Sequence, residues 1–400
     1  MRSLFLWLTG CVSVGVLLAS PAVVRSAEPD SKNVHLRGDL QNARIAFAGK
    51  QKACVAFIGG SITEMNGYRP MVAAELQSRF PDTEFEFINA GISSTCSTSG
   101  AFRLRRDVLA HQPDLLFVEF AVNDDQDAAH AARECRRGME GILRQAWMHD
   151  PELDIVITHF VNPPMLEKLT AGKTPTSSGQ HEAVAEHYGV SSSDLARELA
   201  QRIAAGTFSW QQYGGTHPKQ AGNRLAADLI VDLLDAAWAQ PLPADAQPTA
   251  HSLPAPLDEN SYFRGRFVSP ADAKADDAWK WDRPDWSEIA GGFRDTFRNE
   301  MFLHTSEVGA ELSLEFEGTA VGAFVLAGPD AGMVEVSVDG AKPHVVDLYH
   351  HFSKGLHYPR TVMFATDLPA GKHQLRLRVS GKHNDQSHGH AVRIMQFTAN

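Results

Sequence analysis

The 400-residue sequence is poor in cysteine and contains no CxxC pair. Its four cysteines are Cys11, Cys54, Cys96 and Cys135. The missing CxxC removes support for a structural zinc site or a dithiol redox motif. Without Cys11 three cysteines remain, and an odd number cannot pair completely into a disulfide framework. One disulfide bond or three buried thiols are both compatible with this count.

Positive charge is also in deficit, because 37 Lys and Arg residues face 48 Asp and Glu residues, a formal net charge of −11. A chain of this charge lacks the positive field that draws proteins to phosphate backbones, so we expect no nucleic-acid partner. The hydrophobic share of 43% and the charged share of 21% are typical of a globular protein. They exclude a disordered or collagen-like chain.

Only the N-terminus carries a long apolar run. Arg2 precedes the run at residues 4–19, and small residues follow at 20–27, the pattern of a secretory signal peptide. The run is shorter than the roughly 20 residues that a spanning helix needs. We therefore predict a signal peptide over residues 1–27, export to the periplasm or the exterior, and no stable membrane span. Lipidation at Cys11 is an alternative, although only a short apolar stretch precedes it.

The rest of the chain divides into two patterns joined by a proline-rich segment. Residues 28–240 contain short apolar runs, rich in branched and aromatic residues, that alternate with stretches of helical spacing, which predicts an α/β domain with a parallel sheet covered on both faces. Ligands of such sheets bind beyond the carboxyl ends of the strands. Residues 241–260 read as a linker. Residues 261–400 contain short apolar runs separated by turn signals, which predict an all-β sandwich of jelly-roll type. The runs predicted as strands are 54–58, 85–88, 115–120 and 155–160 in the first domain, and 310–316, 320–326, 333–338, 344–348, 361–365, 373–379 and 392–397 in the second.

A serine stands directly after the first predicted strand, in the segment 57–63 (FIGGSIT). Two glycines before Ser61 allow a tight turn that exposes its hydroxyl. A serine hydroxyl is a weak nucleophile until a base takes its proton. The alternative is that Ser61 only caps the helix that follows.

Three further residues are expected at or near the same edge of the sheet. Gly91 comes after the second strand, Asn123 after the third, and His217 precedes the last helix. A hydroxyl, a glycine N–H, an amide and an imidazole are the parts that acyl transfer requires. Each residue taken singly has an ordinary alternative as a turn, cap or loop residue, but four in this order favour a shared cause.

With these blocks, residues 50–240 resemble the SGNH hydrolase superfamily, the GDSL-type esterases. The resemblance implies a flavodoxin-like three-layer α/β/α fold with Ser61 as nucleophile and His217 as general base. It also implies an oxyanion hole made of the Ser61 and Gly91 backbone N–H groups and the Asn123 side chain. The family uses no metal or organic cofactor, so none is expected.

The sequence departs from the family at three positions. Gly60 stands where the family often has Asp, and Ala121 stands where glycine is usual two residues before Asn123. Gly214 stands where an acid is expected three residues before His217. A catalytic histidine needs a partner on its second nitrogen to fix the tautomer. A backbone carbonyl is the first candidate, and Asp124 or Asp125 is the second. The third possibility is a weak or inert site.

The leading hypothesis is an exported serine esterase that hydrolyses acyl esters, with acetyl groups on a polysaccharide as the expected substrate. Export and an appended β-sandwich that resembles carbohydrate-associated modules favour this substrate, by analogy at the level of fold. A lysophospholipase or thioesterase would use the same site. A non-catalytic carbohydrate-binding protein with a degenerate hydrolase domain is the alternative from another class.

Overall fold

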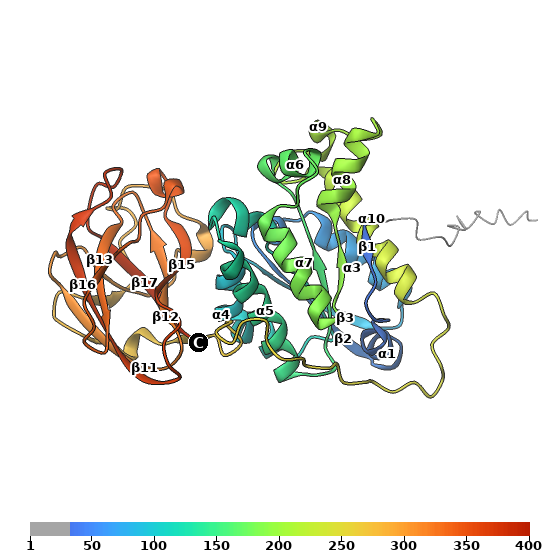
Figure 1. Ribbon diagram of the computed structural model, residues 1–400, viewed down its shortest axis with the longest axis horizontal. Helices are drawn as coiled ribbons and strands as arrows, with labels where there is room; N and C mark the ends of the chain where they lie inside the picture. The colour runs from blue at the N-terminus through green and yellow to red at the C-terminus, as the bar shows by residue number, and fades with distance from the viewer. Residues whose placement is uncertain (1–32) are drawn as a thin grey trace, which may run out of the picture.

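The computed structural model describes residues 33–400. The predicted signal peptide and Cys11 lie outside the described residues. Two domains follow one another along the chain and lie side by side (Figure 1). Within residues 33–400 no helix is long and apolar enough to cross a membrane.

A six-stranded sheet forms the centre of the first domain. Five strands run parallel in the order β3-β2-β4-β5-β6, and β1 pairs antiparallel with β6 at the edge. In chain order the parallel strands read 2-1-3-4-5, the arrangement of flavodoxin-like folds. The strands are β1 (Val34–His35), β2 (Lys52–Gly59), β3 (Glu84–Gly91), β4 (Leu115–Glu119), β5 (Asp154–Thr158) and β6 (Ser191–Ser193).

Helices cover both faces of this sheet, so the three-layer α/β/α prediction is confirmed. One core joins the sheet to α1, α3, α6, α8 and α10, with the Phe57 and Phe117 rings stacked at 4.8 Å. The other core lies under α4, α5 and α7. The helices are α1 (Gln41–Gly49), α2 (Ser61–Glu64), α3 (Tyr68–Arg79), α4 (Ser97–Asp107), α5 (Ala132–His149), α6 (Pro163–Thr170), α7 (Thr176–Tyr188), α8 (Leu195–Ala204), α9 (Trp210–Tyr213) and α10 (Gln220–Ala237).

Two antiparallel sheets pack together in the second domain, as the β-sandwich prediction requires. One sheet has the order β15-β12-β17-β10-β9 with β7 beside β17, and the other has the order β14-β13-β16-β11-β8. All seven predicted runs form strands, and their apolar residues supply the shared core. The strands are β7 (Arg266–Val268), β8 (Lys274–Ala275), β9 (Lys280–Asp282), β10 (Phe302–Thr305), β11 (Glu311–Gly318), β12 (Val321–Ala327), β13 (Gly332–Val338), β14 (His344–Asp347), β15 (Tyr358–Ala365), β16 (Gly371–His383) and β17 (Val392–Ala399).

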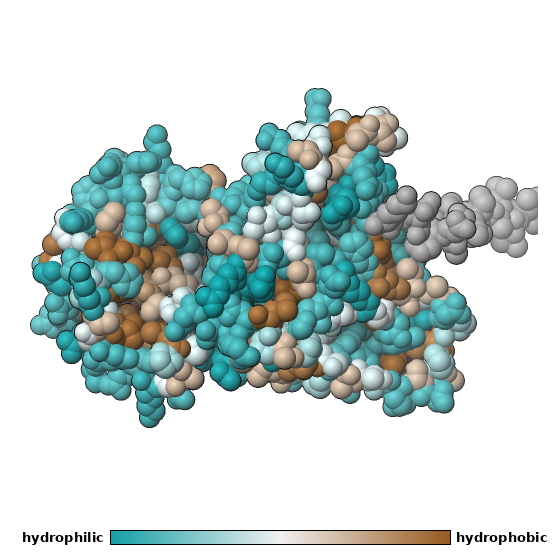
Figure 2. Space-filling view, in the orientation of Figure 1, coloured by the Kyte–Doolittle hydropathy of each residue, from teal (hydrophilic) through white to brown (hydrophobic). Residues whose placement is uncertain are grey.

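The segment between α10 and β7 contains no helix or strand, but residues 249–258 are hydrogen-bonded to the first domain at several points. It runs past α1 and α5 before it reaches the second domain (Figure 1). Asn42 binds it through Thr249, and Arg137 on α5 bonds both Asp258 of this segment and Asp367 of the second domain. The two domains are therefore joined by ion pairs as well as by the chain. Most of the surface in Figure 2 is hydrophilic, with apolar patches over the second domain.

Candidate active site

Three loops at the carboxyl edge of the sheet bring the predicted site residues together. Ser61 begins α2 directly after β2, Gly91 ends β3, and Asn123 follows β4. Because β2 lies between β3 and β4, these three loops are neighbours. The gap between β2 and β4 is also where the strand order reverses, which is where ligands of such sheets bind.

Ser61 and His217 are within hydrogen-bonding distance, although 156 positions separate them in sequence. The distance from Ser61 Oγ to His217 Nε2 is 2.7 Å. With the ring proton on Nδ1, Nε2 accepts the hydroxyl proton, which is the geometry of a general base. Ser61 is half-buried and His217 is exposed, so the imidazole is open to solvent.

The second nitrogen of His217 has no such partner. Within residues 33–400 no protein group hydrogen-bonds Nδ1, so the backbone carbonyl that the sequence analysis favoured is not found. The backbone conformation explains why no acid stands at position 214. Gly214 follows α9 with φ of +108°. A Cβ atom there would lie 2.4 Å from the backbone nitrogen of Lys219. The turn therefore has no room for the acid that the family carries at this position.

Asp124 and Asp125 also do not reach the imidazole. Asp124 is fully buried and accepts hydrogen bonds from the Ser97 N–H at 2.8 Å, from the Ser97 hydroxyl at 2.6 Å and from His181 Nε2 at 2.9 Å. Asp125 accepts from Asn162 Nδ2 at 3.0 Å. The structure therefore gives both carboxylates other partners, and the alternative in which one of them supplies the acid has no contact to support it.

A cluster of side chains of the kinds that can bind a metal ion includes Asp124. The Cys96 sulfur, an Asp124 oxygen and a His130 nitrogen lie within 4.8 Å of one another. Burial acts to lower the pKa of His130, but Cys96 and Asp124 raise it well above the usual value. Burial acts to raise the pKa of Asp124, but His130 and His181 hold it well below its usual range. His130 Nδ1 lies 3.5 Å from Asp124 Oδ1, and the Asp124 oxygens are already bonded as described.

The Asn123 amide packs directly against the residue that precedes the serine. A Cβ atom placed on Gly60 would lie 2.0 Å from Asn123 Oδ1, so only glycine allows this approach. One N–H of the Asn123 amide donates to Asp127 Oδ2 at 2.8 Å, which leaves its second N–H for a ligand. The close contact explains why the aspartate common in the family is absent at position 60.

The two backbone donors of the expected oxyanion hole differ in their present bonding. The Ser61 N–H is at the start of α2 and has no acceptor within that helix. The Gly91 N–H donates to Asn89 Oδ1 at 3.1 Å. Gly91 would have to share this hydrogen bond, or release it, to hold an oxyanion.

A buried carboxylate beneath the site was not identified from the sequence. Glu119, the last residue of β4, is fully buried, and Thr63 Oγ1 donates to it at 3.4 Å. Burial raises the pKa of Glu119 to about 8, although hydrogen bonds from Gly60 and Thr63 act to lower it. The acidic residue at the end of the apolar run 115–120 was the available signal. Asp127 was also missed, although it lies four residues after Asn123 and so within one helical turn of it.

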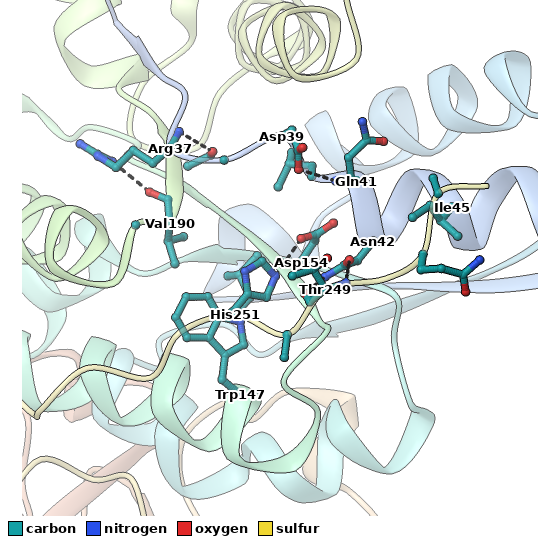
Figure 3. Close-up of a pocket in the computed structure, with 18 of the residues that line it drawn as sticks. Arg37, Asp39, Gln41, Asn42, Ile45, Trp147, Asp154, Val190, Thr249 and His251 are labelled. Atoms are coloured by element: carbon teal, nitrogen blue, oxygen red, sulfur yellow. Dashed lines mark hydrogen bonds and ion pairs between the residues drawn. The ribbon is translucent and has the colours of Figure 1, made fainter. Parts of the chain in front are cut away.

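A cavity of about 400 Å³ lies elsewhere in the first domain (Figure 3). Its lining includes Asp154, the first residue of β5, so it lies at the amino edge of the sheet, away from Ser61. His251 of the linker stacks on Trp147 at 4.8 Å and bonds Asp154 at 2.9 Å. These contacts make the cavity part of the linker's docking surface.

Residues 57–225 match the model of the GDSL-like lipase/acylhydrolase family. This match agrees with the arrangement of Ser61, Asn123 and His217 at the carboxyl edge of the sheet. Residues 57–225 form a GDSL-like lipase/acylhydrolase domain. The domain is accordingly that of a carboxylic ester hydrolase. No curated protein matches the sequence.

Solved structures with the same two-domain arrangement are known. A two-domain esterase (CEX) active on acetylated mannans is 21% identical, with a TM-score of 0.73 over 92% of this chain and 97% of that one. Its complex with mannopentaose aligns with a TM-score of 0.72 over 92% of this chain and 95% of that one, also at 21% identity. At this identity the similarity establishes the fold of both domains.

Proposed function

We propose that the protein is an exported serine esterase that removes acetyl groups from a polysaccharide. The observation that carries the catalytic part is the 2.7 Å hydrogen bond from Ser61 to His217 beside the Asn123 amide. His217 takes the hydroxyl proton while Ser61 Oγ attacks the ester carbonyl carbon. The oxyanion is held by the Ser61 N–H and the Asn123 amide, with the Gly91 N–H once it is released from Asn89.

The intermediate then collapses to an acyl-enzyme. The ester C–O bond breaks, and His217 returns its proton to the departing alcohol oxygen. Water next attacks the acyl carbon with His217 as base, and acetate leaves as Ser61 regains its proton. The residues form a Ser–His dyad, because within residues 33–400 no carboxylate bonds Nδ1 of the exposed imidazole.

Two observations support a polymeric acetyl ester as the substrate. His217 is exposed, so the reacting groups are accessible to a sugar that remains part of a chain. The fold of both domains is that of an esterase described as active on acetylated mannans. The analogy is one of fold, and it selects acetylated mannan as the first polymer to test.

The test compares Ser61→Ala with the wild type on 4-nitrophenyl acetate, on longer acyl chains and on acetylated mannan. We expect the wild type to prefer acetate and the variant to lose turnover, because the nucleophile is gone. Ser78→Ala is the matched control, since Ser78 is exposed on α3. Unchanged turnover in Ser61→Ala would refute the mechanism, and a preference for long acyl chains would favour a lysophospholipase or thioesterase.

Labelling with a fluorophosphonate separates an esterase from an inert binding protein. Only a serine activated by a base reacts, so we expect a label on the wild type that Ser61→Ala loses. A wild type that binds acetylated mannan but neither labels nor hydrolyses would support the non-catalytic alternative. Export is tested separately, by sequencing the N-terminus of the protein secreted from a bacterial host that processes signal peptides.

A further inference from the structure

Asp127 connects the second domain to the amide beside Ser61. Its Oδ2 accepts from Asn123 Nδ2 at 2.8 Å, and its Oδ1 accepts from the Tyr358 hydroxyl at 2.6 Å. Asn123 and Asp127 are the two ends of a single π-helical turn, Asn123–Asp127, whereas Tyr358 begins β15 of the sandwich. Asp127 is 9% exposed, so these bonds are largely shielded from water.

A second group of the sandwich holds the backbone of the same residue. His350 Nε2 is 2.6 Å from the Asp127 carbonyl oxygen, and the Phe352 N–H donates to His350 Nδ1 at 3.3 Å. The ring must therefore carry its proton on Nε2 and donate it to the carbonyl. Burial lowers the pKa of His350 to about 4, in agreement with a neutral ring. The ring also stacks on Tyr358 at 4.3 Å.

The chemistry of this connection determines which way the Asn123 amide faces. Burial raises the pKa of Asp127, while the hydrogen bonds from Tyr358 and Asn123 act to lower it. In its ionised form the carboxylate only accepts hydrogen bonds, so it pairs with the NH₂ side of an amide and not with its oxygen. Asp127 thereby fixes Nδ2 toward itself and holds Oδ1 against Gly60. An amide rotated by half a turn would present its oxygen to the carboxylate, which is repulsive. The second N–H of Nδ2 is thus kept available for an oxyanion.

We propose that Tyr358 and His350 of the β-sandwich are positioning residues for catalysis, acting through Asp127 on the oxyanion-binding Asn123 amide. The second domain is then part of the catalytic apparatus, whether or not it binds carbohydrate. This inference rests on the proposed function. It predicts that changes in the sandwich lower kcat even for a small substrate such as 4-nitrophenyl acetate. A role of the sandwich in polymer binding alone would not predict this effect.

The main experiment measures kcat and KM for 4-nitrophenyl acetate in the full-length Tyr358→Phe variant. Loss of a whole oxyanion donor lowers kcat by about 10²–10³-fold. Tyr358→Phe loosens the donor without removing it, so we expect a smaller loss, about tenfold, with KM nearly unchanged. Tyr349→Phe is the matched control. Tyr349 lies in the same domain and is buried, and its hydroxyl has no hydrogen-bond partner within residues 33–400.

A double-mutant cycle with Asn123→Ala separates positioning from general destabilisation. If Tyr358 acts through Asn123, removing its hydroxyl from the Asn123→Ala enzyme has little further effect on kcat. Asp127→Ala should lower kcat more than Tyr358→Phe does. In the Asn123→Ala enzyme it should likewise have little further effect on kcat. Thermal unfolding of each variant shows whether it is folded at the assay temperature.

The outcomes are distinguishable from those of the proposed function. A wild type without esterase activity refutes the function itself. An active wild type with unchanged kcat in both Tyr358→Phe and Asp127→Ala refutes only the positioning role. Equal losses in the presence and absence of the Asn123 side chain would also overturn it, because they would mean that the hydroxyl acts on stability or on another group. If Tyr358→Phe does not fold, the Asp127→Ala cycle carries the test alone.

Discussion

Restoring the family's acid at position 214 should harm this enzyme rather than improve it. In Gly214→Asp the new Cβ atom would lie 2.4 Å from the Lys219 nitrogen. An ordinary contact needs about 3.4 Å, so the turn that carries His217 must shift by roughly 1 Å, and a displacement of that size costs about 10²-fold in rate. The residue also has φ of +108°, which disfavours any side chain by on the order of 1–3 kcal/mol.

Gly215→Asp is the matched control for this substitution. Gly215 has nearly the same φ, +105°, but no atom lies within 4 Å of its Cβ position. Both variants should therefore lose stability through the backbone, and only Gly214→Asp should carry the additional steric displacement. The assay is kcat for 4-nitrophenyl acetate together with thermal unfolding of both variants.

The result that would refute this reasoning is a gain in turnover. An aspartate that bonded His217 Nδ1 would complete a triad, and the acid of a triad is worth up to about 10⁴-fold in kcat. Gly214→Asp with kcat well above that of the wild type would show that the turn accommodates an acid. Equal behaviour of Gly214→Asp and Gly215→Asp would show that the contact with Lys219 is unimportant.

Two further predictions concern the groups around the serine. Gly60→Ala should lower kcat about 10²–10³-fold, since its methyl group displaces the Asn123 amide from the oxyanion; Gly49→Ala, at a glycine with open space around it, is the control, and normal turnover in Gly60→Ala would contradict the assigned contact. Glu119 has a folded-state pKa of about 8, above its ordinary value of 4.5, so between these values the folded protein holds a proton that the unfolded chain has released. Its contribution to stability therefore falls as pH rises from 4.5 to 8, and each unit of pKa shift corresponds to about 1.4 kcal/mol. Urea unfolding of wild type and Glu119→Gln across this range should show a smaller loss of stability with rising pH in the variant, and parallel curves would refute the buried neutral carboxyl.

Local patterns were sufficient to predict both architectures. Runs such as 54–58 and 115–120 are apolar at every or nearly every position because their strands are buried on both faces. The short apolar runs of the second domain, separated by turn signals, indicated the strands of a β-sandwich. The same logic failed for β6, whose sequence is three serines, Ser191–Ser193. Those side chains are buried but hydrogen-bonded, for example Thr158 Oγ1 with Ser193 Oγ at 3.0 Å, so no apolar pattern marks the strand.

The sequence by itself determined which groups follow which strands, and so placed Ser61, Gly91 and Asn123 at one edge of the sheet. This was possible because the carboxyl ends of parallel strands share an edge whatever the details of packing. Only the tertiary structure decided what each group contacts. His217 Nδ1 has no protein partner in residues 33–400, Asp124 bonds elsewhere, and Tyr358 reaches Asp127 from 231 positions away. Such contacts depend on how the two domains are oriented and on the directions of individual side chains. Neither produces a periodic pattern in the sequence.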